Sequence, residues 1–328
     1  MAWAAKQQGG GQAQGLMHLD DANPILLEAL STRLGKEQKR EPCEIRVSDF
    51  DDVLYLVMVS PEETNQITLN VALRNWADLS RDGAKQVLAA NFPSCEISPE
   101  SGFDVAIKIN ADSLPSGPWG SGGEACAKQL AEIKVLLMGA PLAVALKTFG
   151  EGGSPNSDVK KVSIKRPTGC GGGDMFITAK TDSVVVIFSV DFADETDKAV
   201  CKVFLQEFVE SQRSVTGAPS CAYKRGSEPP SELSSFPNID GTPDIAGFMS
   251  FKLFKDHVKT QEKRDRAVST LIGFLNYLQY HIKASKTYMH MRMRHKVNDL
   301  LQVLNRANQT TDEKKEKKTM SGKTFTRA

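Results

Sequence analysis

The chain has 328 residues, of which 40% are apolar and 25% charged, so it can bury a sizeable core and its length suggests two domains. No apolar run approaches the roughly 20 residues of a membrane span, and the N-terminus lacks the apolar segment of a signal peptide. Together these features predict a soluble globular protein of the cytosol or nucleus and exclude a membrane-spanning or secreted one.

The near-neutral net charge of +1 hides a strong asymmetry along the chain. From Phe251 onward there are 18 Lys and Arg against 7 Asp and Glu, a net of +11, whereas the preceding 250 residues carry 23 against 33, a net of −10. Segregation of this size indicates that the C-terminal region meets an acidic partner, which could be protein, nucleic acid or membrane.

The first predicted module covers residues 23–149 and follows an extension over 1–22 whose Gly, Gln and Ala content predicts disorder. A short helix is expected between Pro24 and Gly35. The remaining predicted elements are three strands of an antiparallel meander within 44–76, a helix over 81–91, a strand over 102–109 and a helical segment over 124–149 that is broken at Gly139–Pro141.

The order of elements repeats after a Gly- and Ser-rich linker over 150–158. The second predicted module, 159–256, contains strands over 160–167, 174–180 and 183–192, a helix over 198–212 and a last strand over 246–254. A strand, an Asp-containing turn, an apolar strand and an acidic loop also follow one another in residues 44–66. We interpret this as an internal duplication of an α/β unit, and the fold class as α+β.

The usual signatures of catalysis, metal binding and nucleotide binding are not recognisable. The six cysteines form no CxxC pair, and His290 and His295 are five residues apart, which points them in different directions on a helix. The Gly-rich stretches 120–125 and 169–174 lack the strand and Lys-Ser/Thr context of a phosphate loop. Acidic pairs such as Asp51/Asp52 fall in predicted turns, where Asp is common for conformational reasons. We therefore expect a binding or assembly protein that is not an enzyme and carries no cofactor or metal.

A long helix is predicted, with its apolar pattern running from Val268 to Ala307. The C-terminal helix region is taken as 257–307, and a basic tail follows over 308–328. Two apolar stripes run along this helix. The first contains Val268, Leu271, Leu275, Leu278, Ile282, Met289, Met293, Val297, Leu300 and Leu304. The second contains Phe274, Tyr277, His281, Ala284, Tyr288 and Met291. Either both stripes form one broad face buried in a single domain, or one stripe covers the chain's own domain and the other a partner chain; we favour the second interpretation.

A basic strip remains on the helix beside these stripes. It is formed by Lys283, Lys286, His290 and Arg294, at spacings of three and four residues. Such a strip is commonly just a solvated face, but the charge asymmetry of the whole chain favours an acidic partner.

A specific pattern of about fifty residues is found at 277–286, 291–294, 303–307, 314–319 and 321–325, with supporting segments at 49–55, 99–102, 202–208 and 228–233. In these segments the chain closely resembles the subunit 2 (34 kDa, p34-Arc) family of the actin-related protein 2/3 complex. The resemblance implies two tandem antiparallel-sheet/helix modules followed by a long helix that pairs with a helix of subunit 4. It further implies a cytoplasmic seven-subunit assembly that holds two actin-related proteins and branches actin filaments.

The resemblance also implies which residues act. Contact with the mother actin filament falls on Lys283, Lys286, Arg292, Arg294, Arg306, Lys314, Lys315, Lys317 and Lys318. Packing against the partner subunit's helix is expected at Leu271, Leu275, Leu278, Ile282, Met289, Val297, Leu300 and Leu304. No nucleic acid or membrane partner is expected. The alternative is a nucleic-acid-binding protein that uses the basic helix and tail, although Tyr277 and Tyr288 fall on an apolar stripe rather than among the basic residues.

Overall fold

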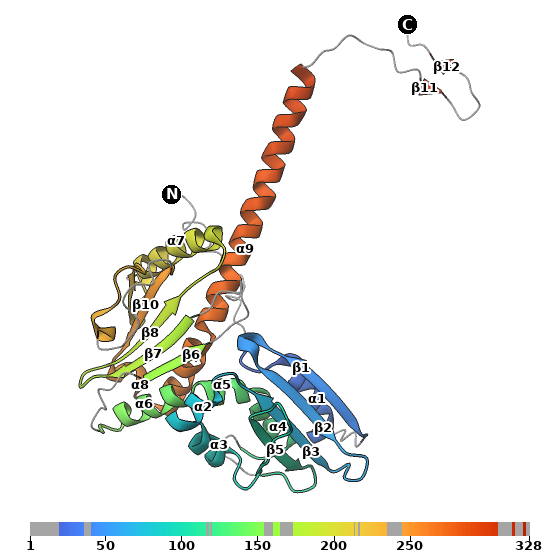
Figure 1. Cartoon of the computed structure of the whole chain (residues 1–328), viewed down its shortest axis with the longest axis vertical. Coiled ribbons are helices and arrows are strands. Elements are labelled where there is room, and N and C mark those ends of the chain that lie inside the picture. The colour runs from blue at the N-terminus through green and yellow to red at the C-terminus, as the bar shows by residue number, and fades with distance from the viewer. Residues whose placement is uncertain are drawn as a thin grey trace, which may run out of the picture. The chain divides into compact units, whose positions relative to one another are not determined.

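A computed structural model describes residues 20–35, 41–115, 118, 120–153, 160–164, 173–212, 214–215, 217–234, 245–307, 317–318 and 324–325 (Figure 1). The chain divides into two compact units, Met1–Ile282 and Lys283–Ala328. The predicted extension up to residue 19, the linker residues 154–158, the loop 165–172 and most of the tail after Ala307 lie outside the described residues.

The first sheet is a five-stranded antiparallel sheet in the spatial order β1-β2-β3-β5-β4. Its strands are β1 (Cys43–Ser48), β2 (Leu54–Val59), β3 (Gln66–Ala72), β4 (Glu96–Ile97) and β5 (Val105–Asn110). The predicted meander is confirmed as β1 to β3. Alternate residues of β2, such as Tyr55 and Val57, point into the core, as expected for a half-buried strand.

Helices complete the first module, and the last of them also contacts strands of the second sheet. They are α1 (Pro24–Leu34), α2 (Trp76–Leu79), α3 (Lys85–Asn91), α4 (Gly123–Ala131), α5 (Ile133–Met138) and α6 (Ala140–Gly150), with a π-helical turn at Ser80–Ala84. Helix α1 begins where the sequence predicts, because the Asn23 side chain accepts hydrogen bonds from the backbone N–H groups of Ile25 and Leu26, both at 3.1 Å. The helical segment predicted over 124–149 breaks at Gly139, as expected, and also at Glu132.

The second sheet repeats the first in the order β6-β7-β8-β10-β9. Its strands are β6 (Lys160–Ile164), β7 (Gly173–Ala179), β8 (Val184–Val190), β9 (Ser220–Lys224) and β10 (Gly247–Leu253), with helix α7 (Glu195–Gln212) after β8. In both sheets a three-stranded meander is followed by helical structure, then by an edge strand, and then by a strand inserted between that edge strand and the meander. The shared order supports the internal duplication that the sequence suggested.

One large apolar core runs through both modules and includes the first part of the long helix. In the second module the centre of this core is aromatic. The ring centroid of Phe274 lies 5.1 Å from that of Phe188 and 5.0 Å from that of Phe251. A smaller cluster around Phe176, Ile187 and Phe248 buries the opposite face of this sheet beneath Leu233. Both faces of the second sheet are therefore covered.

The C-terminal part consists of helix α8 (Lys255–Val258), helix α9 (Gln261–Ala307, 47 residues) and a two-stranded ribbon, β11 (Lys317–Lys318) with β12 (Thr324–Phe325). Helix α9 begins seven residues before the predicted start, in the polar segment QEKRDRA. The predicted α+β class, with two antiparallel-sheet modules and a long C-terminal helix, is confirmed. Among the described residues, no helix combines the length and the apolar character needed to cross a lipid bilayer.

Candidate interaction surface

The first half of α9, up to Ile282, is part of the chain's own core. Leu271, Leu275, Leu278 and Ile282 of the first apolar stripe are all buried, with at most 6% of their surface exposed. From the second stripe, Phe274 is buried as well, while Tyr277 and His281 are half-buried. Partner packing was predicted for the four aliphatic residues, but the chain itself already covers them, so they leave no surface for a second helix.

A glycine allows the buried half of α9 to approach the first module closely. Gly139 lies at the junction of α5 and α6, and a Cβ atom added there would lie 2.4 Å from Val268 Cγ1 and 2.5 Å from the Val135 carbonyl oxygen. Any larger residue would therefore push α9 away from this junction.

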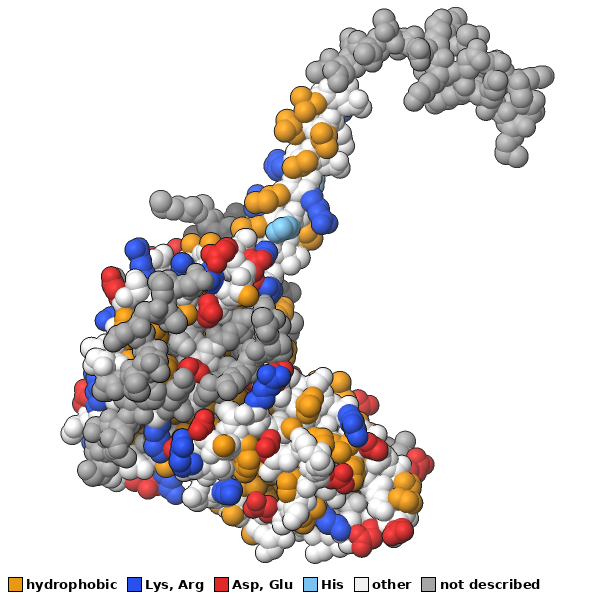
Figure 2. All heavy atoms as spheres, viewed as in Figure 1, with side chains coloured by type: hydrophobic (Ala, Val, Ile, Leu, Met, Phe, Trp, Pro, Cys, Tyr) orange, Lys and Arg blue, Asp and Glu red, His pale blue; other side chains and the backbone are white. Residues whose placement is uncertain are grey.

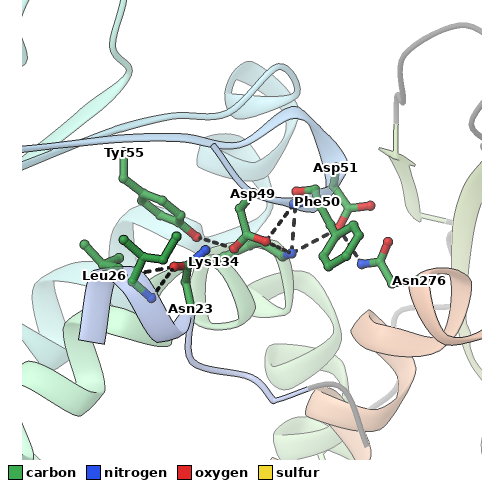
Figure 3. Close-up of polar contacts among 9 residues, drawn as sticks. Asn23, Leu26, Asp49, Phe50, Asp51, Tyr55, Lys134 and Asn276 are labelled. Atoms are coloured by element: carbon green, nitrogen blue, oxygen red, sulfur yellow. Dashed lines mark hydrogen bonds and ion pairs between the residues drawn. The ribbon is translucent and has the colours of Figure 1, made fainter. Parts of the chain in front are cut away.

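A buried polar cluster also ties α9 to the first module (Figure 3). The Lys134 ammonium on α5 lies 3.5 Å from Asp49 Oδ1 and 3.4 Å from Asp51 Oδ2, and its side chain is 9% exposed. Asn276 of α9 donates a hydrogen bond of 2.9 Å to Asp51 Oδ2. Tyr55 donates to Asp49 Oδ2 at 3.2 Å. The cluster thus links the β1–β2 turn, α5 and α9 through charge-assisted contacts in the interior.

The turn that supplies these carboxylates has an unusual backbone. Asp51 and Asp52 both have positive φ angles, 66° and 58°, a conformation that Asp tolerates better than most residues. Asp52 also forms an ion pair of 2.8 Å with Arg74. The sequence indicated only a turn at this position, and no feature of its pattern distinguishes a buried aspartate from an exposed one.

The second half of α9, Lys283–Ala307, presents its apolar residues to solvent (Figure 2). From the first stripe Met293, Val297 and Leu300 are 61%, 55% and 58% exposed, and Met289 and Leu304 are exposed too. Ala284, Tyr288 and Met291 of the second stripe are also exposed. The division between covered and uncovered apolar surface therefore runs along the helix, and each stripe is covered in the first half and open in the second.

The basic residues predicted to act lie on this same second half. Lys283, Arg292, Arg294 and Arg306 are exposed, and Lys286 is half-buried. The Arg292 guanidinium lies over the Tyr288 ring at 5.8 Å from its centroid. Because Lys286 is three residues before Met289, it lies in line with the first apolar stripe rather than clear of it.

Other predicted positions give less information. Lys314 and Lys315 lie outside the described residues, and Lys317 and Lys318 are described only as backbone in β11. No group of three or more His, Cys, Asp or Glu residues in the described part of the chain could hold a metal ion. Burial raises the pKa of the Cys126 and Cys201 thiols to about 12, so these two are protonated and unreactive near neutral pH.

Comparison with known proteins supplies a family. Residues 69–311 match the family described as "Arp2/3 complex, 34 kD subunit p34-Arc". The chain is 30% identical over 333 residues to "Actin-related protein 2/3 complex subunit 2" of Schizosaccharomyces pombe, covering 95% of this chain and 100% of that protein. It is also 30% identical over 279 residues to the protein of the same name in Dictyostelium discoideum, covering 85% of this chain and 89% of that protein.

Proposed function

Since the chain belongs to the p34-Arc family, the 34 kDa subunit of the Arp2/3 complex, we propose that it is a structural, non-catalytic subunit of such a complex. It acts in the cytoplasm, in the actin cytoskeleton, within an assembly of seven subunits that includes two actin-related proteins. The exposed apolar surface on the second half of α9 is the observation that supports this assignment. A monomeric soluble protein rarely leaves such a continuous apolar surface open, so this surface indicates a partner.

The partner on this surface is a helix of subunit 4. A helix-on-helix contact suits the spacing of Met289, Val297, Leu300 and Leu304, which repeat at three and four residues or multiples of these. We therefore keep these four residues of the predicted packing set and add the exposed Met293, because Leu271, Leu275, Leu278 and Ile282 are buried within the chain.

Contact with the mother actin filament falls on the basic residues of the C-terminal region. The exposed members are Lys283, Arg292, Arg294 and Arg306 of α9, joined by Lys286 and by the tail positions Lys314, Lys315, Lys317 and Lys318. Long-range attraction from this basic region would speed the encounter with an acidic filament and would weaken as salt is added.

Affinity purification of the tagged chain from its native cytosol tests membership of the complex. Recovery of two actin-related proteins and a subunit 4 relative in equal amounts is the expected result. Recovery of the chain alone would contradict the proposal. Recovery of the chain with nucleic acid, in a preparation not treated with nuclease, would also contradict it and would favour the nucleic-acid-binding alternative.

Charge reversal tests the filament contact. The triple variant Lys283→Glu, Lys286→Glu and Arg306→Glu should reduce co-sedimentation of the purified complex with actin filaments by tenfold or more, roughly the effect of losing several charge pairs. The matched control carries Lys255→Glu, Lys259→Glu and Arg266→Glu, which change the net charge equally at exposed positions outside the second half of α9. Loss of assembly in the first variant would instead place Lys283, Lys286 and Arg306 in a contact between subunits.

A further inference from the structure

The second half of α9 carries positive charge on both sides of one apolar row. The row consists of Met289, Met293, Val297, Leu300 and Leu304. Successive residues of a helix are about 100° apart, so a residue just after a row member lies on one edge of the row and a residue just before a member lies on the other. His290 and Arg294 follow row members, whereas Arg292 and Lys296 precede them.

Acidic residues are almost missing from this part of the helix. Lys283–Ala307 contains six Lys and Arg against a single acidic residue, Asp299, a net charge of +5. Asp299 is engaged within the helix, because its Oδ2 lies 3.1 Å from His295 Nδ1 and 3.9 Å from Lys296 Nζ. Arg292 and Arg294 therefore present positive charge to whatever covers the row, whereas the charge of Lys296 is partly balanced by Asp299.

The surface beside the row is hollowed on the Arg294 edge. Met293, Val297 and Leu301 line a shallow groove there together with His290 and Arg294. An apolar side chain from a partner can enter this groove, and a carboxylate beside that side chain can reach the Arg294 guanidinium. One segment of a partner chain can therefore make both an apolar contact and a charge pair at this groove.

The character of the edges changes toward the end of the helix. Leu301 follows Leu300, and Val303 precedes Leu304, so beyond Leu300 both edges are apolar and exposed. The part of the row where basic residues could pair with acidic residues of a partner is accordingly confined to the turns between His290 and Lys296.

We propose that the row takes an amphipathic helix of another chain whose apolar seam is flanked on both edges by Asp and Glu, and that the basic edges disfavour pairing with a second copy of this chain. The proposal rests on the proposed function, which already assigns a helix to this surface, and adds the chemistry by which that helix is chosen. It assigns Arg292 and Arg294 to this helix, which leaves the filament contact to Lys283, Lys286, Arg306 and the basic tail. Like charges placed along both edges would repel in any self-pairing that brings two such regions together.

A charge-swap experiment tests the proposal with the full-length chain. The probes are two labelled helical peptides of about four heptads with Leu at the core positions, one carrying Glu and the other Lys at the flanking positions. Fluorescence anisotropy should show the Glu peptide binding about tenfold more tightly than the Lys peptide. Reversal of the edges in the variant Arg292→Glu, Arg294→Glu and Lys296→Glu should invert this preference.

Two controls separate charge recognition from other effects. The variant Lys255→Glu, Lys259→Glu and Arg266→Glu should keep the preference of the wild type for the Glu peptide. The preference should also shrink in 1 M salt, where screening reaches about 3 Å. Equal binding of both peptides, binding of neither, or a stable dimer of the wild-type chain at low salt would each overturn the proposal. Because the affinity purification tests membership of the complex separately, any of these results would leave that membership standing.

Discussion

Lys134 is a single side chain on which the free energy of unfolding should depend strongly. Its ammonium is buried between the carboxylates of Asp49 and Asp51, so replacement by Met keeps the volume but removes the cation that both carboxylates face. We expect Lys134→Met to lower the free energy of unfolding by about 3 kcal/mol, measured by urea denaturation of the purified chain. Lys147→Met, an exposed lysine on α6, is the control and should change it by less than about 0.5 kcal/mol. Similar losses in the two variants would show that the buried cation contributes nothing.

His281 introduces a pH dependence at the last buried turn of α9. Its ring lies among those of Phe204, Tyr277 and Tyr280, its Nε2 atom is buried without a hydrogen-bond partner, and burial lowers the pKa of the imidazole. The unfolded chain therefore binds more protons than the folded chain near pH 6, and stability falls as pH drops through the unfolded value of about 6.5.

Replacement of this histidine should remove that dependence. Between pH 7.5 and 5.5, the Tm of the wild type should fall more than that of His281→Phe, whose ring can keep the aromatic contacts without a titrating group. Thermal unfolding followed by circular dichroism at both pH values measures the difference. Parallel loss of Tm in the two proteins would assign the acid sensitivity to other groups.

Two glycines test how the elements pack, and they should respond in opposite directions. At Gly139 an added methyl group would collide with Val268 of α9, so Gly139→Ala should destabilise the chain by about 1–3 kcal/mol. At Gly273, inside α9, a methyl group would meet no atom within 4 Å, so Gly273→Ala should stabilise the chain by about 0.5–1 kcal/mol through helix propensity. Urea denaturation measures both changes. Stabilisation at both positions would mean that α9 does not approach the α5–α6 junction as closely as described.

Elements with a strong period were predictable, and short or polar ones were not. The continuous apolar runs of β2, LYLVMV, and β8, VVVIFSV, identify them as strands, whereas β4 has only two residues and β9, SCAYK, has no distinctive pattern. The start of α9 was missed because residues 261–267 carry no apolar period. Periodicity also revealed both stripes of α9 but not where they become uncovered, because an apolar face reports that something packs on it and not whether the neighbour belongs to the same chain.

The core of the whole molecule determines which part of α9 its stability requires. The large apolar cluster spans both modules and reaches along α9 to Ile282, while the apolar side chains from Met289 to Leu304 remain exposed. Burial supplies most of the free energy of folding, so the exposed half should contribute little to it and should serve association instead.

Truncation separates these two roles. A chain ending at Lys286, one turn beyond Ile282, should remain monomeric with a free energy of unfolding within about 1 kcal/mol of the full chain, because it keeps every buried residue of α9 and the backbone hydrogen bonds of their last turn. It should also fail to recover partner subunits. A chain ending at Arg266 loses Leu271, Phe274, Leu278 and the rest of the buried half, and should be insoluble or unfolded. Size-exclusion chromatography, circular dichroism and urea denaturation measure these outcomes. A marked loss of stability in the chain ending at Lys286 would show that the second half of α9 supports the fold itself.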